Sequence, residues 1–530
     1  MVSTLRLYGW SSIAAIIMLA TGLLLLLGLI STRVRPPLTP DSWAYLLLAR
    51  SFGSIPYHIP LVRQYQYLTD AADSFPPVWP LILFLVSRLL RLGPWLGIIT
   101  AAVFTVGLLP CIVIMLRPLV HARGRRHFAA VAIWAALLSY GPFLDDILGG
   151  RSMAAALLCY VAIGIALTRL RETGFRTGLI VGGLAGLLWM TRFDSAPIVV
   201  VLGLGLPFAW QRGGVLRWLT GYGIAVALML LPWMLYSRVA FGVAFASDNA
   251  MVAKSAAINF VNNWYPVFPP TLREAGAEWL ARVTHNLPGI TSSLWRGTTR
   301  YAFAPALLAV FALWTRTQPG NLARWTSRQV GVTLVIVAAF IAQLAGPLTT
   351  GFFELRYFAP IFLAISFWSL VLLVTSPVHR FRRMAMVPLL IGAALGWKKS
   401  LYAEQVVHQH PDFMDLQHIS RGGRDGLISG VPIGELDRCL PRTARVLMAT
   451  DDVAAYAVGY YLDRIGLELP HNWPQLSGDE RSKFLDALSV TYVVAVPADT
   501  TIPPNRLQSV PGCAGVLEVV RPATRAAARQ

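Results

Sequence analysis

Charged residues are scarce in this sequence. Of its 530 residues, 13% are Asp, Glu, Lys or Arg, whereas 55% are hydrophobic. A soluble globular protein carries roughly twice that charged fraction. The shortage excludes an ordinary soluble globule, and the long apolar runs that accompany it predict a polytopic α-helical membrane protein.

Cysteines and compact catalytic motifs are also few. The four cysteines form no CxxC pair, and the chain contains no HExxH, no GxSxG and no glycine-rich phosphate loop. These absences argue against a zinc ribbon, a zincin, an α/β-hydrolase and a P-loop enzyme. Cys439 and Cys513 are the two cysteines of the polar tail, and if the tail is extracytoplasmic they either pair or remain as two free thiols.

Acidic residues are outnumbered, with 26 Asp and Glu against 45 Lys and Arg. In a soluble chain this balance would suggest nucleic acid, but in a membrane protein basic loops set the topology and meet anionic lipid headgroups. We therefore expect membrane lipids and no nucleic acid as partners. Arginine clusters separate alternate apolar runs and are expected to be cytoplasmic, at residues 117–126, 169–176, 212–217, 316–328 and 380–383.

The apolar runs predict about eleven transmembrane helices. They fall at residues 10–31, 95–116, 127–142, 151–169, 176–191, 195–211, 217–236, 301–315, 330–347, 357–375 and 384–397. We expect a multi-pass protein of the cytoplasmic (inner) membrane with a cytoplasmic N-terminus and two long outer loops, 32–94 and 238–300. Residues 1–397 form the membrane domain, and 398–530 a soluble extracytoplasmic domain.

One apolar segment, residues 77–92, is left out of this count. Arg88 and Arg91 interrupt it, which suits an amphipathic helix lying in the membrane interface. The glycine-rich stretch 178–188 predicts close packing between helices.

The acidic residues of the membrane part support the same topology. Before residue 400 they all fall on or near the predicted outer face except Glu172. The positive-inside rule considers only Lys and Arg, so this segregation was not built into the assignment. It places any chemistry on the outer side.

The tail has the pattern of a small α/β domain. Strand-like runs at 445–449, 492–496 and 516–520 alternate with helical stretches at 453–462 and 481–488.

Asp41 opens a short predicted helix, 42–52, just beyond the first apolar run. In one interpretation Thr39 or Asp41 caps that helix, which is worth about 1 kcal/mol. In the other, Asp41 is a carboxylate at the outer mouth of the membrane domain that accepts a proton from an incoming hydroxyl. Asp145 and Asp146, in the next outer loop, are either a solvated helix start with Arg151 as counter-ion or candidate catalytic residues, one of which is a second carboxylate that helps to position a polar substrate. Because neighbours in sequence point in different directions, we expect only one of them to face the site.

Several outward cations could hold a phosphate, or could simply extend to lipid headgroups. Glu354 is close enough in sequence to pair with Arg356. The candidate lipid-phosphate and substrate-binding residues are Arg63, Arg151, Arg192, Lys254, Arg356, Tyr357 and Glu354.

Taken in order, four stretches resemble the GT-C superfamily of integral-membrane glycosyltransferases, which includes protein mannosyltransferases and aminoarabinose transferases. They are PDSWAYLLLAR, SFPPVWPLILFLVSRLL, the loop with Asp145 and Asp146, and ELRYFAP. The resemblance implies that Asp41 is the catalytic base and that the segment after Pro76 and Pro77 is an interfacial helix.

The resemblance also implies a reaction. A polyprenyl-phosphate-linked sugar is the donor substrate, the acceptor is a lipid, glycan or protein hydroxyl, and the anomeric centre inverts. Many members have a second acid after the first, where this chain has Ser42, so we expect no metal held by adjacent carboxylates and no cofactor. Aminoarabinose transferases carry a lysine before the proline pair, where this chain has Phe75, so Arg63 or Arg356 is expected to contact the phosphate instead.

Two other functions remain open. A transporter or lipid flippase also needs many spans, although it usually carries charges near the bilayer midplane. A non-catalytic membrane scaffold with an outer partner-binding domain is the third alternative.

Overall fold

The computed structural model describes most of the chain in separate stretches. These are residues 19–20, 22–23, 40–52, 61–62, 75–169, 174–210, 214–241, 244–245, 283–292, 327–344, 348, 355–375, 427–428, 431–448, 455, 458–469, 473, 476–494 and 506–520. The predicted spans at 301–315 and 384–397 lie outside these residues, as do nearly all of 10–31 and most of the loop 238–300.

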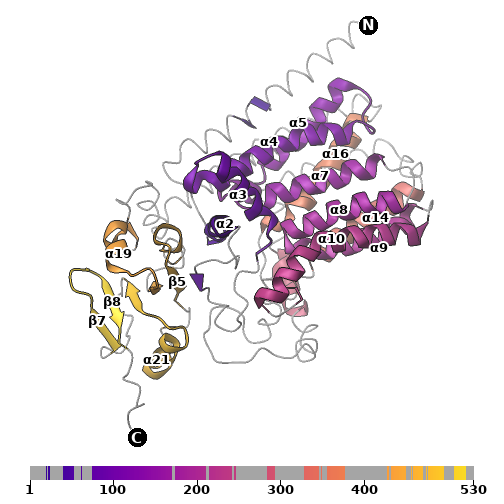
Figure 1. Ribbon diagram of the computed structural model, residues 1–530. Helices are drawn as coiled ribbons and strands as arrows, with labels where there is room; N and C mark the ends of the chain where they lie inside the picture. The colour runs from indigo at the N-terminus through magenta and orange to yellow at the C-terminus, as the bar shows by residue number, and fades with distance from the viewer. Residues whose placement is uncertain are drawn as a thin grey trace.

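Apolar helices form a bundle (Figure 1). Their bounds agree with the predicted spans to within a few residues: α4 (Leu96–Leu116), α5 (Arg123–Leu138), α7 (Met153–Arg169), α8 (Phe175–Thr191), α9 (Ala196–Trp210), α10 (Val215–Phe241), α14 (Ser327–Gln343) and α16 (Ala359–Thr375).

Among the described residues, two helical segments are long and apolar enough to cross a membrane, Leu96–Leu116 and Val215–Val239. A third is added if the bent pair formed by α5 and α6 (Gly141–Leu148) counts as one span. The other helices of the bundle are shorter, so the total of about eleven spans stays a prediction.

The bend between α5 and α6 corrects one expectation. The sequence predicted a single span over 127–142, but α5 ends at Leu138 and α6 leaves it at an angle of 76°. Pro142 explains the break, because proline fits the first turn of a new helix but cannot continue an old one. Asp145 and Asp146 therefore lie on a helix and not in a loop.

Glycines bring α8 and α10 into close contact, as the sequence predicted. Gly178, Gly182 and Gly186 recur every fourth residue and so share one face of α8. A Cβ atom on Gly182 would lie 2.5 Å from the carbonyl oxygen of Tyr222 on α10, which is closer than any side chain can approach.

Two short helices precede the bundle. The first, α2 (Pro40–Ser51), begins at Pro40, so Asp41 lies inside its first turn and not at the cap position, whereas Thr39, the other capping candidate, lies outside the described residues. The second, α3 (Val78–Leu89), is the expected helix and buries Trp79 and Leu83 on one face, while Ser87 and Arg88 are exposed. Its place in the membrane interface stays a prediction.

The C-terminal residues form the expected α/β fold, with a mixed six-stranded sheet of order β1-β5-β4-β6-β8-β7. Three predicted strands are confirmed as β4 (Arg445–Met448), β6 (Tyr492–Val494) and β8 (Val516–Val519). The remaining elements are β5 (Ile465–Glu468), β7 (Leu507–Ser509), a two-stranded pair of β2 (Leu427–Ile428) and β3 (Val431–Pro432), α19 (Ile433–Cys439), α21 (Gly478–Ala487) and a π-helical turn, η7 (Val458–Leu462).

Two long-range links complete this domain. Cys439 and Cys513 form a disulfide, which decides the alternative that the sequence left open. The edge strand β1 (Leu61–Val62) comes from the first outer loop and pairs in parallel with β5. The loop and the tail thus share one sheet, which the sequence pattern did not predict.

Candidate active site

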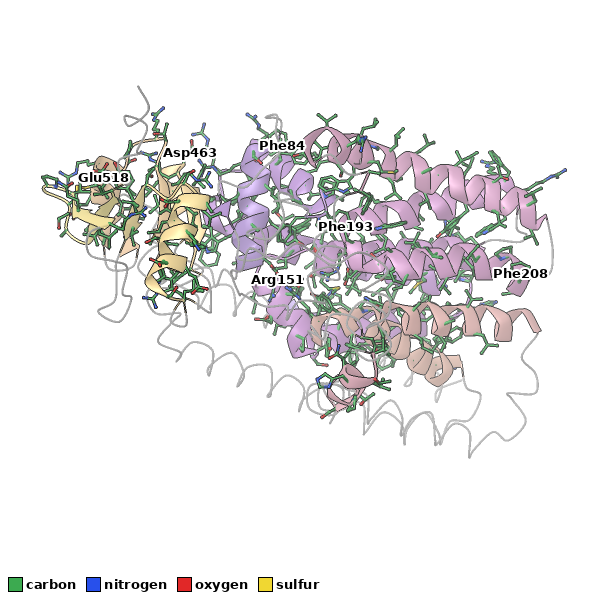
Figure 2. All side chains as sticks on the ribbon, turned by 90° about the horizontal axis from the view of Figure 1, so that it is seen from below. Phe84, Arg151, Phe193, Phe208, Asp463 and Glu518 are labelled. Carbon is green, nitrogen blue, oxygen red and sulfur yellow. A yellow bond between two sulfur atoms is a disulfide. The ribbon has the colours of Figure 1, made fainter. Side chains whose placement is uncertain are left out.

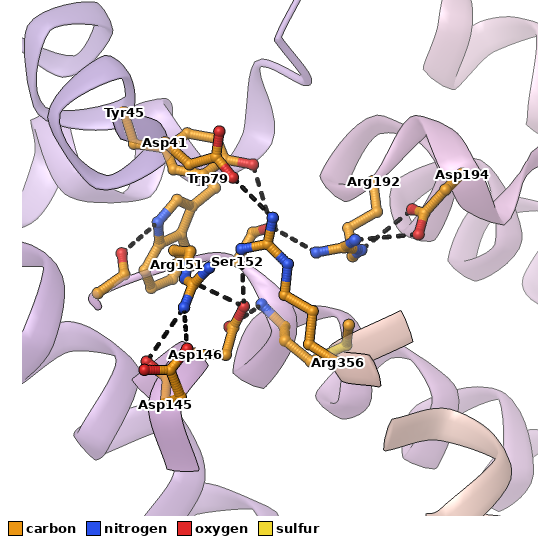
Figure 3. Close-up of polar contacts among 12 residues, drawn as sticks. Asp41, Tyr45, Trp79, Asp145, Asp146, Arg151, Ser152, Arg192, Asp194 and Arg356 are labelled. Carbon is orange, nitrogen blue, oxygen red and sulfur yellow. Dashed lines mark hydrogen bonds and ion pairs between the residues drawn. The ribbon is translucent and has the colours of Figure 1, made fainter. Parts of the chain in front are cut away.

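Four segments meet at one end of the helix bundle, and each contributes polar side chains (Figure 3). They are the start of α2, the turn between α6 and α7, η3 (Phe193–Ser195) and η6 (Leu355–Phe358). Figure 2 shows Arg151 near the C-terminal domain and Phe208 at the far end of the bundle. Arg125 donates to the carbonyl of Val374 at the other ends of α5 and α16, so that arginine cluster lies opposite the site.

The central contact is an ion pair between Asp41 and Arg356. Nη2 of Arg356 donates to Oδ2 of Asp41 at 2.7 Å. The Asp41 side chain is 27% exposed, whereas that of Arg356 is only 7% exposed. A carboxylate that solvent reaches thus faces a nearly buried guanidinium.

Asp146 lies behind this pair and is completely buried. Its Oδ1 atom is 3.6 Å from Nη1 of Arg356 and 3.6 Å from Nε of Arg151. Its Oδ2 atom accepts a 3.0 Å hydrogen bond from the backbone N–H of Met153, the first residue of α7. Asp146 therefore holds two arginines and the start of a helix.

Asp145, its neighbour, points elsewhere. Its side chain is 68% exposed, and Oδ2 accepts from Nη2 of Arg151 at 2.5 Å. Consecutive helical residues point about 100° apart, so only one of the two can face the buried side. The sequence reasoning expected one of them to face the site, and that one is Asp146.

The turn that carries Arg151 needs a glycine. Gly150 has φ +68°, and a Cβ on it would lie 2.7 Å from the carbonyl carbon of Gly97. Nε1 of Trp79 donates to the Gly150 carbonyl at 3.1 Å. The turn is thus pressed against α4 and bonded to α3, which fixes Arg151 beside Asp146.

A second pair, Arg192 and Asp194, lies next to the first. Nε and Nη2 of Arg192 donate to the two carboxylate oxygens of Asp194, both at 3.0 Å, and Nη1 donates to Oγ of Ser152 at 3.4 Å. Burial on its own would lower the pKa of Arg192, but the Asp194 carboxylate outweighs it and raises the pKa, so the guanidinium stays charged. The hydroxyls of Ser152 and Tyr45 are 3.3 Å apart.

The ring of Tyr357 lies near both guanidiniums. The Cζ atoms of Arg192 and Arg356 are 5.1 Å and 5.6 Å from its centroid. Because the side chains of Arg151, Arg192 and Arg356 are 7 to 12% exposed, these three do not extend to lipid headgroups.

Burial raises the pKa of the Tyr45 hydroxyl to about 12. It therefore stays protonated at neutral pH and forms hydrogen bonds without acting as a base. Asp41, 27% exposed, is more open to solvent than Asp194, 20%, and Asp146, which is buried, and it is less exposed than Asp145, 68%.

The structure brings together Asp41, Asp145, Asp146, Arg151, Arg192, Arg356 and Tyr357 of the predicted site residues. Arg63, Lys254 and Glu354 lie outside the described residues. Sequence reasoning missed Tyr45, Ser152 and Asp194; the signal for Tyr45 was its position one helical turn after Asp41. The part of the chain that the structure describes holds no cluster of three or more potential metal ligands, and metal independence stays a prediction.

The described residues thus form an apolar helix bundle with charged groups collected at one end and a small α/β domain. No family model and no curated protein matches the sequence. Solved structures do match, and they show that the chain has the fold of the GT-C membrane glycosyltransferases, as the sequence resemblance predicted.

Two of the matching structures are described by their similarity to this chain. ArnT from Cupriavidus metallidurans bound to undecaprenyl phosphate is 12% identical and has a TM-score of 0.56, with 96% of this chain and 98% of that chain covered. The Archaeoglobus fulgidus oligosaccharyltransferase tethered with an acceptor peptide is 13% identical and has a TM-score of 0.51, with 92% of this chain covered. The chain spans only 69% of that oligosaccharyltransferase, and 63% of it in its complex with Zn and sulfate.

Proposed function

We propose that the chain is a glycosyltransferase that moves a sugar from a polyprenyl-phosphate donor to an acceptor hydroxyl on the outer face of the cytoplasmic membrane. The observation that carries the proposal is the contact between Asp41 and Arg356, which puts a partly exposed carboxylate beside a buried cation. The fold shared with an ArnT structure that holds undecaprenyl phosphate supports a lipid-phosphate substrate.

In the proposed reaction, Asp41 removes the proton from the acceptor hydroxyl. The hydroxyl oxygen attacks the anomeric carbon from the face opposite the phosphate, so the configuration inverts. The bond from the anomeric carbon to the phosphate oxygen breaks, and polyprenyl phosphate leaves with the electron pair. General-base catalysis contributes about 10² to 10⁴ in rate, and cations that stabilise the leaving phosphate contribute the electrostatic part.

The pairing of Asp41 with Arg356 fits this reaction because the donor phosphate is an anion that competes for the same guanidinium. When the phosphate occupies Arg356, Asp41 is released from the guanidinium and contacts the acceptor hydroxyl instead. Asp146, wholly buried, stays as the counter-ion of Arg356 through this exchange.

The proposal is tested by comparing Asp41→Asn with wild type in cells that lack the gene. Mass spectrometry of the cell-envelope glycans measures whether each variant restores the mass of the sugar that is missing from cells without the gene. We expect wild type to restore it and Asp41→Asn to fail at equal protein level, while Glu518→Gln, an exposed acid of the C-terminal domain far from the site, restores it. Near-wild-type transfer by Asp41→Asn would remove Asp41 as the base.

A second measurement tests whether Arg356 binds the phosphate of the lipid carrier. Binding of undecaprenyl phosphate to purified protein should weaken about tenfold in Arg356→Lys, because a lysine ammonium cannot reproduce the planar fork that contacts two groups. If the lipid crosses proteoliposome membranes and no covalent product forms, the chain is a transporter and not a transferase.

A further inference from the structure

Helix α2 lies between the helix bundle and the C-terminal domain (Figure 1) and presents a different face to each. Because successive helical residues are about 100° apart, Asp41 and Tyr45 lie on one face and Trp43 on nearly the opposite one. Asp41 contacts Arg356, and Tyr45 contacts Ser152 and the ring of Phe75. The helix is therefore attached to the membrane domain along its Asp41 face.

The Trp43 face packs on the π-helical turn η7. The ring centroids of Trp43 and Tyr460 are 5.0 Å apart, and those of Trp43 and Tyr461 are 5.9 Å apart, both with edge-to-face geometry. Arg50, in the last turn of α2, donates to the Tyr460 carbonyl and lies 5.0 Å from the centre of the Tyr460 ring. Trp43 is only 3% exposed. Edge-to-face aromatic pairs add about 0.5 to 1.5 kcal/mol each to the energy of burial.

The turn η7 is itself firmly held. Nε and Nη2 of Arg464, just beyond the turn, donate to the carbonyl of Leu440 at 3.1 and 2.9 Å, and Nη2 also pairs with Asp437 of α19 at 3.1 Å. The disulfide between Cys439 and Cys513 joins the end of α19 to the turn between β7 and β8. A π-helix is a rare, strained form that is concentrated at functional sites. The C-terminal domain thus offers α2 a rigid aromatic platform.

We propose that Tyr460 and Tyr461 are positioning residues, which hold the candidate base Asp41 in place by packing on Trp43 two residues along the same helix. This assigns a role to the C-terminal domain and rests on the proposed function of Asp41. Nε1 of Trp43 and the hydroxyl of Tyr461 have no hydrogen-bond partner within the described residues, so these two side chains couple by ring packing, beside the hydrogen bond from Arg50 to the Tyr460 carbonyl.

The test compares Tyr461→Ala with Tyr461→Phe in the full-length protein. Hydrogen–deuterium exchange of residues 40–51 should rise severalfold in Tyr461→Ala, because one of the two rings that pack on Trp43 is lost while Tyr460 and its contacts with Arg50 remain. It should stay at the wild-type level in Tyr461→Phe, which keeps the ring. An intact disulfide between Cys439 and Cys513 in non-reducing gels shows that the domain is folded. If Tyr461→Ala does not fold, Tyr461→Leu, which keeps bulk without an aromatic edge, takes its place.

Turnover and lipid affinity, measured on the same variants, distinguish a positioning role from a general loss of structure. Turnover should fall about tenfold to a hundredfold in Tyr461→Ala, as expected for a base displaced by about an ångström. The affinity for undecaprenyl phosphate should change less than twofold, since Arg356 and Arg192 are held by contacts outside η7. Equal losses of affinity and turnover would overturn the proposal.

The exchange measurement also keeps this inference distinct from the proposed function, because it needs no reaction. Unchanged exchange in α2 of Tyr461→Ala, with transfer intact in wild type, refutes the positioning role alone. Raised exchange with no transfer by wild type refutes the proposed function and leaves the mechanical coupling established.

Discussion

Replacing Asp146 with asparagine should destabilise the fold, because its carboxylate is buried between two arginines. The change keeps the shape of the side chain and a carbonyl oxygen for the N–H of Met153, and it removes only the charge. Oδ1 is 3.6 Å from a nitrogen of each of Arg151 and Arg356, and the side chain has no exposure. Losing the charge of Asp146 therefore removes an electrostatic attraction to both guanidiniums.

The expected loss in the free energy of unfolding depends on which carboxylate partners each arginine keeps. Removing one partner of a buried pair costs about 3 to 5 kcal/mol. Arg151 keeps Asp145, and Arg356 keeps Asp41, so we expect the lower end, about 3 kcal/mol. Thermal unfolding in detergent should show an apparent midpoint lower by about 3 °C, because the unfolding entropy of about 2.1 cal/mol/K per residue is summed over 530 residues.

Asp145→Asn is the matched control, since the adjacent residue has the same chemistry but is 68% exposed. A surface ion pair is worth about 0 to 1 kcal/mol, so its midpoint should move by no more than about 1 °C. Equal shifts in the two variants would contradict the reasoning. Loss of sugar transfer in Asp146→Asn without any loss of stability would make Asp146 a reactant and not a counter-ion.

Two further predictions concern stability. Gly182→Ala should lower the detergent unfolding midpoint, because its Cβ would collide with the Tyr222 carbonyl, whereas Gly183→Ala, which has open space, should not; similar behaviour of the two would argue against the α8–α10 contact. Cys439→Ser should cost about 2 to 4 kcal/mol through the loop of 74 residues that its bond with Cys513 closes, and the same loss should follow reduction of the wild type. A midpoint that reduction leaves unchanged would refute the second prediction.

Local sequence pattern was sufficient to predict most helices of the bundle and three strands of the sheet. Apolar runs set the helices of the bundle, since each needs only its own residues to satisfy its backbone, and alternation in the tail identified three of the sheet strands. Local pattern failed between α5 and α6, where the apolar character continues across the break at Pro142. It was also silent on β1, whose partner lies some four hundred residues away along the chain.

The candidate site shows the same division. Residue type and predicted topology were enough to predict that acids and arginines lie together on one face. Which of them meet was decided by packing: Arg356 reaches Asp41 across 315 residues, and Asp146 is buried while its neighbour Asp145 faces solvent. Such pairings depend on how helices are placed against one another, which no short stretch of sequence encodes. The sequence alone determined most helices of the bundle and three of the strands, whereas only the tertiary structure decided that α2 places Asp41 against Arg356 on one face and Trp43 against two tyrosines on the other.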